Sequence, residues 1–148
     1  MSVDRKITKD LIETLEDGRK GFADAADKLA DTNRADIAPK FREFAEQRAG
    51  FSAELETMAA AYGDDIDEDG SVLAAVHRGW MSLKDALAGS DPDGVLDAAE
   101  QGEDHALSEY DKALANTEIS ADLRTVVQRQ HAVIATAHAE VKRLRDTV

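Results

Sequence analysis

Carboxylates and histidines are the side chains of this chain that could do chemistry. Its 148 residues include 31 Asp and Glu, four His and no Cys, so disulfides, thiolate metal sites and thiol catalysis are excluded. The sequence shows no ordered Ser, His and Asp of a nucleophilic triad and no glycine-rich phosphate loop. The chemistry left to test is metal binding by oxygen and imidazole ligands, or a buried ion pair.

A buried ion pair is indicated by Arg48, which stands in an apolar helical stripe. The other members of this stripe are Ile37, Phe41, Phe44, Phe51 and Leu55. At about 100° per residue, Arg48 falls at the centre of their common face. Because burying an unpaired charge costs several kcal/mol, the sequence predicts a partner for Arg48 inside the protein.

Helical periodicity must position these residues. Apolar side chains recur at helical spacing along most of the chain, and β-branched residues never alternate with polar ones over a useful length. Pro39 and Pro92 both fall near expected helix starts, where proline is tolerated. The predicted helices span about residues 4–30, 34–62, 71–87, 92–115 and 120–145.

The order and length of these helices predict the fold class. Four of them are long, and the shorter one lies in the long crossover between the second and third long helices. Tight connections join the first pair and the last pair. This is the pattern of an all-α, ferritin-like antiparallel four-helix bundle. We expect residues 1–148 to form a single domain of this kind, because no repeat or low-complexity segment interrupts them.

Several short motifs on these helices carry a family resemblance. They are Leu11–Gly18, Glu46–Arg48 followed by Phe51, His77–Trp80 with Leu83 and Lys84, and Gly102–Asp104 with Tyr110. Together they resemble an uncharacterised bacterial family of four-helix-bundle proteins in the ferritin-like superfamily. The resemblance covers nearly the whole chain and implies a fold and a bacterial origin. It implies no activity, because the family is a domain of unknown function, although ferritins and rubrerythrins bind two metal ions in the bundle centre.

A di-iron centre of that kind is not expected here. It needs an inward Glu on two helices and an inward Glu-x-x-His on each of the other two. The second long helix has no histidine, and Glu13 and Glu16 point away from the apolar face of the first. On the last helix, Gln130 marks the inner face, which leaves His131 on its flank. We therefore predict no metal in the bundle centre and no cofactor.

The centres of the inner faces are occupied instead by Gly18, Arg48, Glu103 and Gln130. Each lies near the midpoint of its helix, so antiparallel packing is expected to bring them into one layer, with Glu100 leaning in. A carboxylate matches the donor fork of a guanidinium, Gln130 could complete the pair, and Gly18 leaves room where a side chain would clash. We predict a buried Arg48–Glu103 pair in place of the metals. The alternative is that Arg48 extends to solvent and the layer holds water.

The acidic loop 63–70 supports a separate hypothesis. Asp65, Asp67 and Asp69, followed by Gly70, match the first half of an EF-hand calcium loop. The position that should carry the bidentate carboxylate is Val76. The alternative is an acidic, solvated loop, and any cation binding at these aspartates is expected to be weak.

The charge of the chain bounds its partners. A formal net charge of −13 opposes general binding to nucleic acid or to anionic membranes. The first ten residues are charged where a signal peptide is apolar, and no apolar run approaches the roughly 20 residues of a membrane span. We expect a cytoplasmic protein without nucleic-acid or membrane partners. A homo-oligomer is a further expectation, because such bundles commonly form them.

These observations favour a non-catalytic bundle protein that acts by binding or assembly, with a stress-related role as one form of this hypothesis. One alternative is a metal-binding, rubrerythrin-like oxidoreductase with a reduced ligand set. Another is weak cation binding by the acidic loop. Metal content separates the first two, because near-stoichiometric iron, manganese or zinc would contradict the favoured hypothesis.

Overall fold

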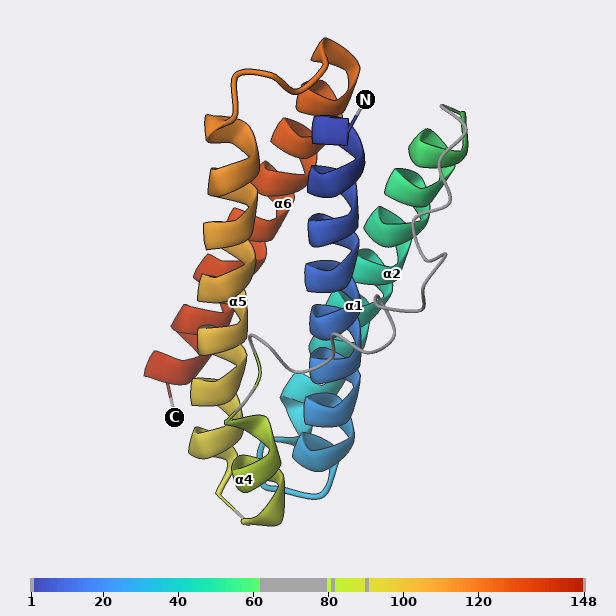
Figure 1. The fold of residues 1–148 in the computed structure, drawn as a ribbon. Helices are drawn as coiled ribbons and strands as arrows, with labels where there is room; N and C mark the ends of the chain where they lie inside the picture. Colours follow the sequence, from blue (N-terminus) through green and yellow to red (C-terminus); the bar gives the residue numbers. More distant parts are fainter. Residues whose placement is uncertain (1, 62–79, 81, 90, 148) are drawn as a thin grey trace.

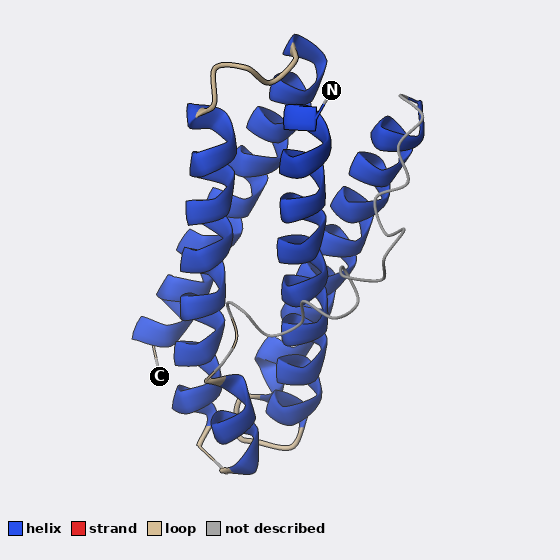
Figure 2. Cartoon of the chain, in the orientation of Figure 1, coloured by secondary structure: helices blue, strands red, loops and turns tan. Residues whose placement is uncertain are grey.

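Long helices make up most of the structure, a computed structural model that describes residues 2–61, 80, 82–89 and 91–147. The long helices are α1 (Ser2–Ala30), α2 (Ala38–Ala61), α5 (Pro92–Ala115) and α6 (Ala121–Asp146), and the short ones are η1 (Ala35–Ile37) and α4 (Leu83–Ala88) (Figure 1). The described residues contain no strand (Figure 2), which confirms an all-α helical bundle for this part of the chain. None of the helices within these ranges is long and apolar enough to cross a membrane.

The helices pack in a defined order. α1 packs against both α2 and α5, and α5 packs against α6. α1 and α6 run in one direction along the bundle, whereas α2 and α5 run in the other (Figure 1). The connection between α2 and α5 therefore joins opposite ends of the bundle. α4 lies at the end where α5 begins (Figure 1).

Capping residues begin two of the long helices where the sequence predicts. A side-chain oxygen of Asp91 accepts a hydrogen bond from the backbone N–H of Asp93 at 2.9 Å, and Pro92 occupies the first turn of α5. Ser120 Oγ accepts from the backbone N–H of Leu123 at 3.2 Å and starts α6. These contacts satisfy backbone donors that have no partner within the helix.

Two other helix starts differ from the prediction. The second long helix, expected from residue 34, begins at Ala38 after the 3₁₀ turn η1. Pro39 lies in its first turn, where its missing N–H costs no hydrogen bond. The short helix expected over residues 71–87 is described only as α4, which begins at Leu83. Trp80 lies outside α4, so the helix predicted to run through it is wrong there, and residues 71–79 lie outside the described residues.

Trp80 is held in the core at a position where the sequence predicts a helix. Its side chain, 2% exposed, lies between α1 and α5. A Cβ atom added at Gly21 would be 2.3 Å from the indole Cδ2, and one added at Gly102 would be 2.2 Å from Cε2. The ring of Phe22 packs edge-on, with its centroid 4.8 Å from that of the indole. Gly21 and Gly102 therefore leave a slot between α1 and α5 for the Trp80 indole, because a side chain at either position would overlap the ring.

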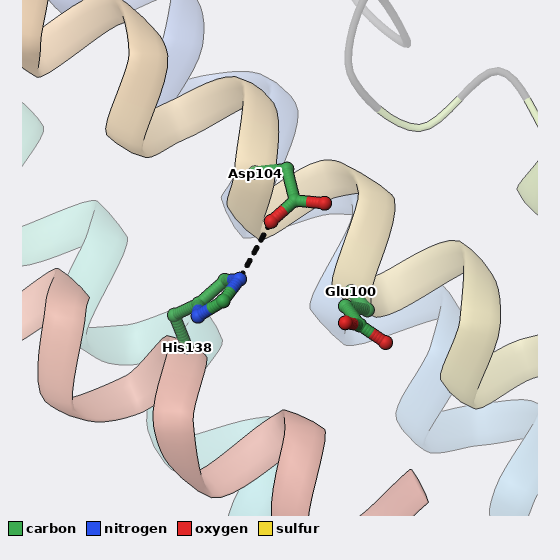
Figure 3. Close-up of side chains that lie close together, drawn as sticks. All are labelled: Glu100, Asp104 and His138. Atoms are coloured by element: carbon green, nitrogen blue, oxygen red, sulfur yellow. Dashed lines mark hydrogen bonds and ion pairs between the residues drawn. The ribbon is translucent and has the colours of Figure 1, made fainter.

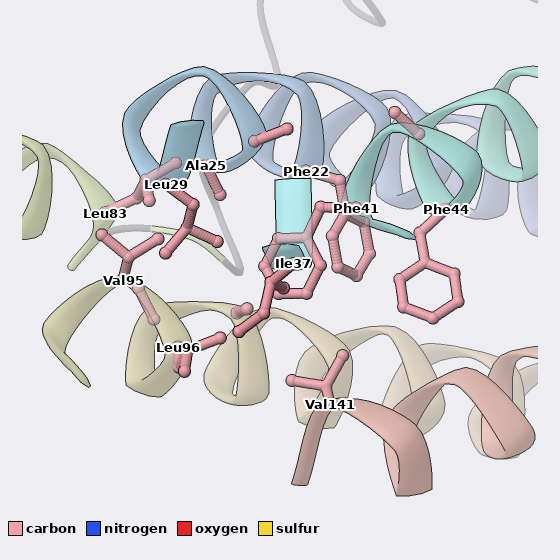
Figure 4. Close-up of a cluster of buried hydrophobic side chains, with 14 of the residues drawn as sticks. Phe22, Ala25, Leu29, Ile37, Phe41, Phe44, Leu83, Val95, Leu96 and Val141 are labelled. Atoms are coloured by element: carbon pink, nitrogen blue, oxygen red, sulfur yellow. The ribbon is translucent and has the colours of Figure 1, made fainter. Parts of the chain in front are cut away.

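Apolar side chains form two clusters along the bundle. One contains Phe22, Phe41, Leu96 and Val141, and the rings of Phe22 and Phe41 pack edge-on at 5.1 Å (Figure 4). The other cluster includes Leu15, Leu55, Tyr110, Val127 and Ile134. Along α1, α2 and α5, the predicted central positions Gly18, Arg48 and Glu103 fall between residues of the two clusters. The candidate site therefore lies between two apolar halves of the core.

Candidate functional site

An ion pair between α2 and α5 lies in the core. Nη1 and Nη2 of Arg48 donate to Oε1 and Oε2 of Glu103 at 2.5 and 2.8 Å. Each of these side chains is 1% exposed. Two parallel hydrogen bonds are the geometry in which a guanidinium matches a carboxylate best. The structure thus brings Arg48 and Glu103 together, and Arg48 does not extend to solvent.

Neighbouring side chains hold Arg48 in place. Its Nε donates to Oε1 of Gln47 at 3.2 Å, and its guanidinium carbon lies 5.2 Å from the centre of the Phe22 ring, in range for a cation–π contact. Gly18 faces it from α1, but a Cβ atom there would lie 3.6 Å from Arg48 Cγ and Nη1, an ordinary van der Waals contact. The prediction that a side chain at position 18 would clash is therefore wrong for alanine.

Gln130 belongs to a second buried network. Its Oε1 accepts from the hydroxyl of Tyr110 at 2.7 Å, and its Nε2 donates to the carbonyl of Phe51 at 3.3 Å and to Oε1 of Glu54 at 2.9 Å. Glu54 is also ion-paired with Arg129. Burial raises the pKa of the Tyr110 hydroxyl, so this group remains a hydrogen-bond donor well into the alkaline range.

The predicted single polar layer is thus two separate groups. Among the described contacts, Gln130 has no hydrogen bond to Arg48 or Glu103. Tyr110, its partner on α5, follows Glu103 by two helical turns, which is about 10 Å along the axis. Gln130 therefore does not complete the Arg48–Glu103 pair. The physical reason is the register of α6 against α5, which sets Gln130 opposite Tyr110.

Glu100 also lies apart from the Arg48–Glu103 pair, and the prediction that it leans into that layer is wrong. Its Oε2 is 2.5 Å from Nη1 of Arg145, near the end of α6. The side chain is 15% exposed, so it lies at the boundary of the core. Hydrogen bonding to Asp146 and the charge of Glu100 raise the pKa of Arg145, which stays cationic. This cation draws the Glu100 carboxylate towards α6.

A cluster that could hold a metal ion lies beside Glu100. It consists of Glu100 and Asp104 from α5 and His138 from α6 (Figure 3). Their ligand atoms all lie within 4.8 Å of one another, and Nε2 of His138 is 2.6 Å from Oδ1 of Asp104. Sequence reasoning missed this cluster because it looked for metal ligands only in the bundle centre and in the acidic loop. The i, i+4 spacing of the two carboxylates was the available signal.

Two carboxylates of α1 are more buried than the sequence suggests. Glu13 is 7% exposed and Asp17 is 2% exposed. Glu16 is half-buried, paired with Arg19 at 2.5 Å, and accepts from Ser52 Oγ at 3.4 Å. The prediction that Glu13 lies on an outer surface is wrong. α1 contacts α2, α5 and α4, and these neighbours cover more than one side of the helix. Side chains away from its apolar face can therefore be buried as well.

The acidic-loop hypothesis falls outside the described residues. Asp65, Asp67 and Asp69 all lie in the range 62–79, and weak cation binding there stays a prediction.

Comparison with known proteins gives a family. A family model described as a domain of unknown function (DUF2383) matches residues 6–116. The chain belongs to this family. The matched range includes Arg48, Glu103 and the α5 carboxylates of the cluster, whereas Gln130 and His138 on α6 lie beyond it. No curated protein matches the sequence. The family description carries no activity, so the function has to be argued from the geometry.

Proposed function

We propose that this protein is a ferritin-like four-helix bundle in which a buried ion pair takes the place of a di-metal centre, and that it acts by binding or assembly rather than by catalysis. The observation that carries the proposal is the two-bond contact between Arg48 and Glu103, each 1% exposed. A guanidinium there supplies a fixed positive charge. A metal ion placed beside it would be repelled and would compete with it for Glu103.

The course of the helices supports the ferritin-like part of this proposal. α2 and α5 run in the same direction, so their connection joins opposite ends of the bundle (Figure 1), as one long crossover in a ferritin-like bundle requires. His131, the histidine of the Gln-x-x-His sequence on α6, is paired with Asp111 at 2.8 Å at the bundle surface. The proposal takes residues 1–148 as one domain of a bacterial, cytoplasmic protein.

Metal analysis tests the non-catalytic part. Wild-type protein without an affinity tag is purified and analysed beside His138→Ala, which removes the histidine of the separate α5–α6 cluster. We expect no stoichiometric iron, manganese or zinc in the variant, and no acceleration of Fe²⁺ oxidation by oxygen in either protein. Near-stoichiometric metal that persists in His138→Ala and disappears in Glu103→Gln would place an ion in the bundle centre and contradict the proposal.

Sedimentation velocity tests the assembly part. A homo-oligomer that persists on dilution is expected if assembly is the role of the bundle. A monomer at every concentration would exclude assembly with copies of this chain and restrict the proposal to binding of another partner.

A further inference from the structure

We propose that Glu100, Asp104 and His138 form a binding site for one divalent transition-metal ion at the seam between α5 and α6. This site goes beyond the proposed function, because it lies apart from the Arg48–Glu103 pair and uses none of its atoms. Its ligands come from two helices, so an occupied site would also join α5 to α6.

The spacing of the ligands fits a single ion. Glu100 and Asp104 are four residues apart on α5, which places their carboxylates on one face at successive turns. His138 meets them from α6 (Figure 3), and the three ligand atoms lie within 4.8 Å of one another. Ligand bonds of about 2.0–2.2 Å at the tetrahedral angle put two ligands of the same ion about 3.3–3.6 Å apart. Side-chain rotations that close the widest separation by about 1–1.5 Å would therefore bring all three within reach.

The exposure of the ligands suits an ion that enters from solvent. The Glu100 and His138 side chains are 15% and 21% exposed, whereas Asp104 is 64% exposed. Glu100 and His138, the less exposed side chains, can thus fix the position of the ion, and the exposed Asp104 can move to complete the site. Nε2 of His138 is hydrogen-bonded to Asp104 Oδ1 at 2.6 Å, which places any proton of this contact on the nitrogen that the ion would take. Ligation needs the bare Nε2, so that proton moves to Nδ1 or, from the imidazolium, leaves to solvent.

The charge balance at the site remains favourable to a cation. Nη1 of Arg145 lies 2.5 Å from Oε2 of Glu100, but that buried oxygen accepts no hydrogen bond from the described residues. The Arg145 guanidinium bonds Asp146 at 3.2 Å and lies 3.8 Å from Asp97. Carboxylates therefore outnumber this one cation around the cluster, and they shield part of its repulsion of a metal ion.

The ligand types select the class of metal. One imidazole and two carboxylates, with no thiolate, suit Zn²⁺, Mn²⁺ or Fe²⁺ better than the all-oxygen cations Ca²⁺ and Mg²⁺. Three protein ligands leave at least one position for water. Zn²⁺ is the probe for affinity, and Co²⁺ is the probe for geometry because its visible absorption reports its coordination.

The same pair of helices offers a matched control. His131 of α6 contacts Asp111 of α5 through Nε2 and Oδ1 at 2.8 Å, the same atoms as in the His138–Asp104 pair. Each of its residues lies seven positions from its counterpart, but the residue four before Asp111 is Leu107. The His131–Asp111 pair therefore reproduces the histidine and the aspartate of the proposed site without its third ligand.

Calorimetric titration of the untagged full-length protein with ZnCl₂ tests the site. We expect one ion per chain, and we expect His138→Gln and Glu100→Gln each to weaken binding by about tenfold or more. His131→Gln should leave the affinity and stoichiometry unchanged. Co²⁺ should give a visible absorption band that Zn²⁺ removes, and that is absent from His138→Gln. Circular dichroism of each variant establishes that the helices are intact.

Three outcomes would overturn the proposal. One is the absence of binding at millimolar Zn²⁺. Another is an equal loss in His131→Gln and His138→Gln, which would mean adventitious binding by surface histidines. The last is binding that does not depend on Glu100. None of these outcomes bears on the Arg48–Glu103 pair, so the proposed function stands or fails separately.

Discussion

Removal of the Glu103 carboxylate should cost about 3 kcal/mol of unfolding free energy. Glu103→Ala deletes both acceptors of the Arg48 fork, which lies in the core with its side chain 1% exposed in the wild type. Breaking a buried ion pair from one side costs about 3–5 kcal/mol. We expect the lower end of this range, because Arg48 keeps its hydrogen bond to Gln47 and its contact with the Phe22 ring.

Urea unfolding followed by circular dichroism measures this loss. In a domain of this size, 1 kcal/mol shifts Tm by about 2–4 °C, so Glu103→Ala should lower Tm by about 6–12 °C. Glu43→Ala is the matched control, because Glu43 forms an exposed pair with Lys40 at 3.5 Å and its side chain is 69% exposed. Its removal should change stability by less than about 1 kcal/mol.

The size of the loss decides whether the reasoning holds. A loss below about 1 kcal/mol for Glu103→Ala would refute it, because the guanidinium would then have found water or another partner. The double variant Arg48→Met with Glu103→Leu separates charge from packing. Apolar replacement of both partners is often neutral, so this variant should regain most of the lost stability. If it is as unstable as Glu103→Ala, the loss comes from packing and not from an uncompensated charge.

Further predictions follow from the glycines and from Tyr110. Gly102→Ala should destabilise by about 1–3 kcal/mol in urea, because its methyl group would meet the buried indole at 2.2 Å. Gly18→Ala should instead stabilise the protein by up to about 1 kcal/mol, and so should Gly50→Ala, whose Cβ would meet nothing within 4 Å. Equal losses of stability in all three variants would contradict the slot for the Trp80 indole. Burial raises the folded-state pKa of Tyr110 above its ordinary value of about 10, so stability should fall as pH rises past that value. Tyr62 is the other of the two tyrosines, so Tyr62→Phe leaves Tyr110 as the only source of phenolate absorbance. This absorbance should appear only as the helices unfold, and ionisation of Tyr110 in the intact protein near pH 10 would contradict the prediction.

Periodicity and caps were sufficient to predict the long helices. The starts of α5 and α6 follow from Pro92 and Ser120, which act locally. The position of Arg48 on an inner face also follows from its own helix, because six apolar or charged positions repeat at helical spacing. The burial of Trp80 could not be predicted in this way, because it depends on glycines of two other helices.

Axial register is what the sequence left open. Periodicity gives the face of a helix on which Gln130 lies, but not its height relative to α5. Sliding α6 by one or two turns keeps its apolar face inward and changes every polar partner. Only the packed bundle shows that Gln130 meets Tyr110 of α5 and not the Arg48–Glu103 pair.

The rotation of α5 explains how one helix carries both a buried ion pair and an outer cluster. Taking Glu103 as the reference, Asp104 lies about 100° around the axis and Glu100 about 60° in the same sense. Both therefore flank Glu103 on one side, and the contacts of Asp104 with His138 and of Glu100 with Arg145 show that this side faces α6. Glu103 faces Arg48 of α2 instead.

This division of the α5 carboxylates bears on the kind of function that the bundle supports. In a di-metal centre, buried carboxylates bridge two ions, and their shared position makes oxygen chemistry available. Here the buried carboxylate is already neutralised by Arg48, a cation that cannot be exchanged or reduced. An ion at the outer cluster would be held by half-buried and exposed ligands and would join α5 to α6, so its first effect would be to stabilise their packing. Zn²⁺ at 100 times its Kd should accordingly raise the unfolding free energy by about 2.7 kcal/mol in the wild type and in Glu103→Ala alike, whereas an effect confined to the wild type would mean that the two sites are coupled.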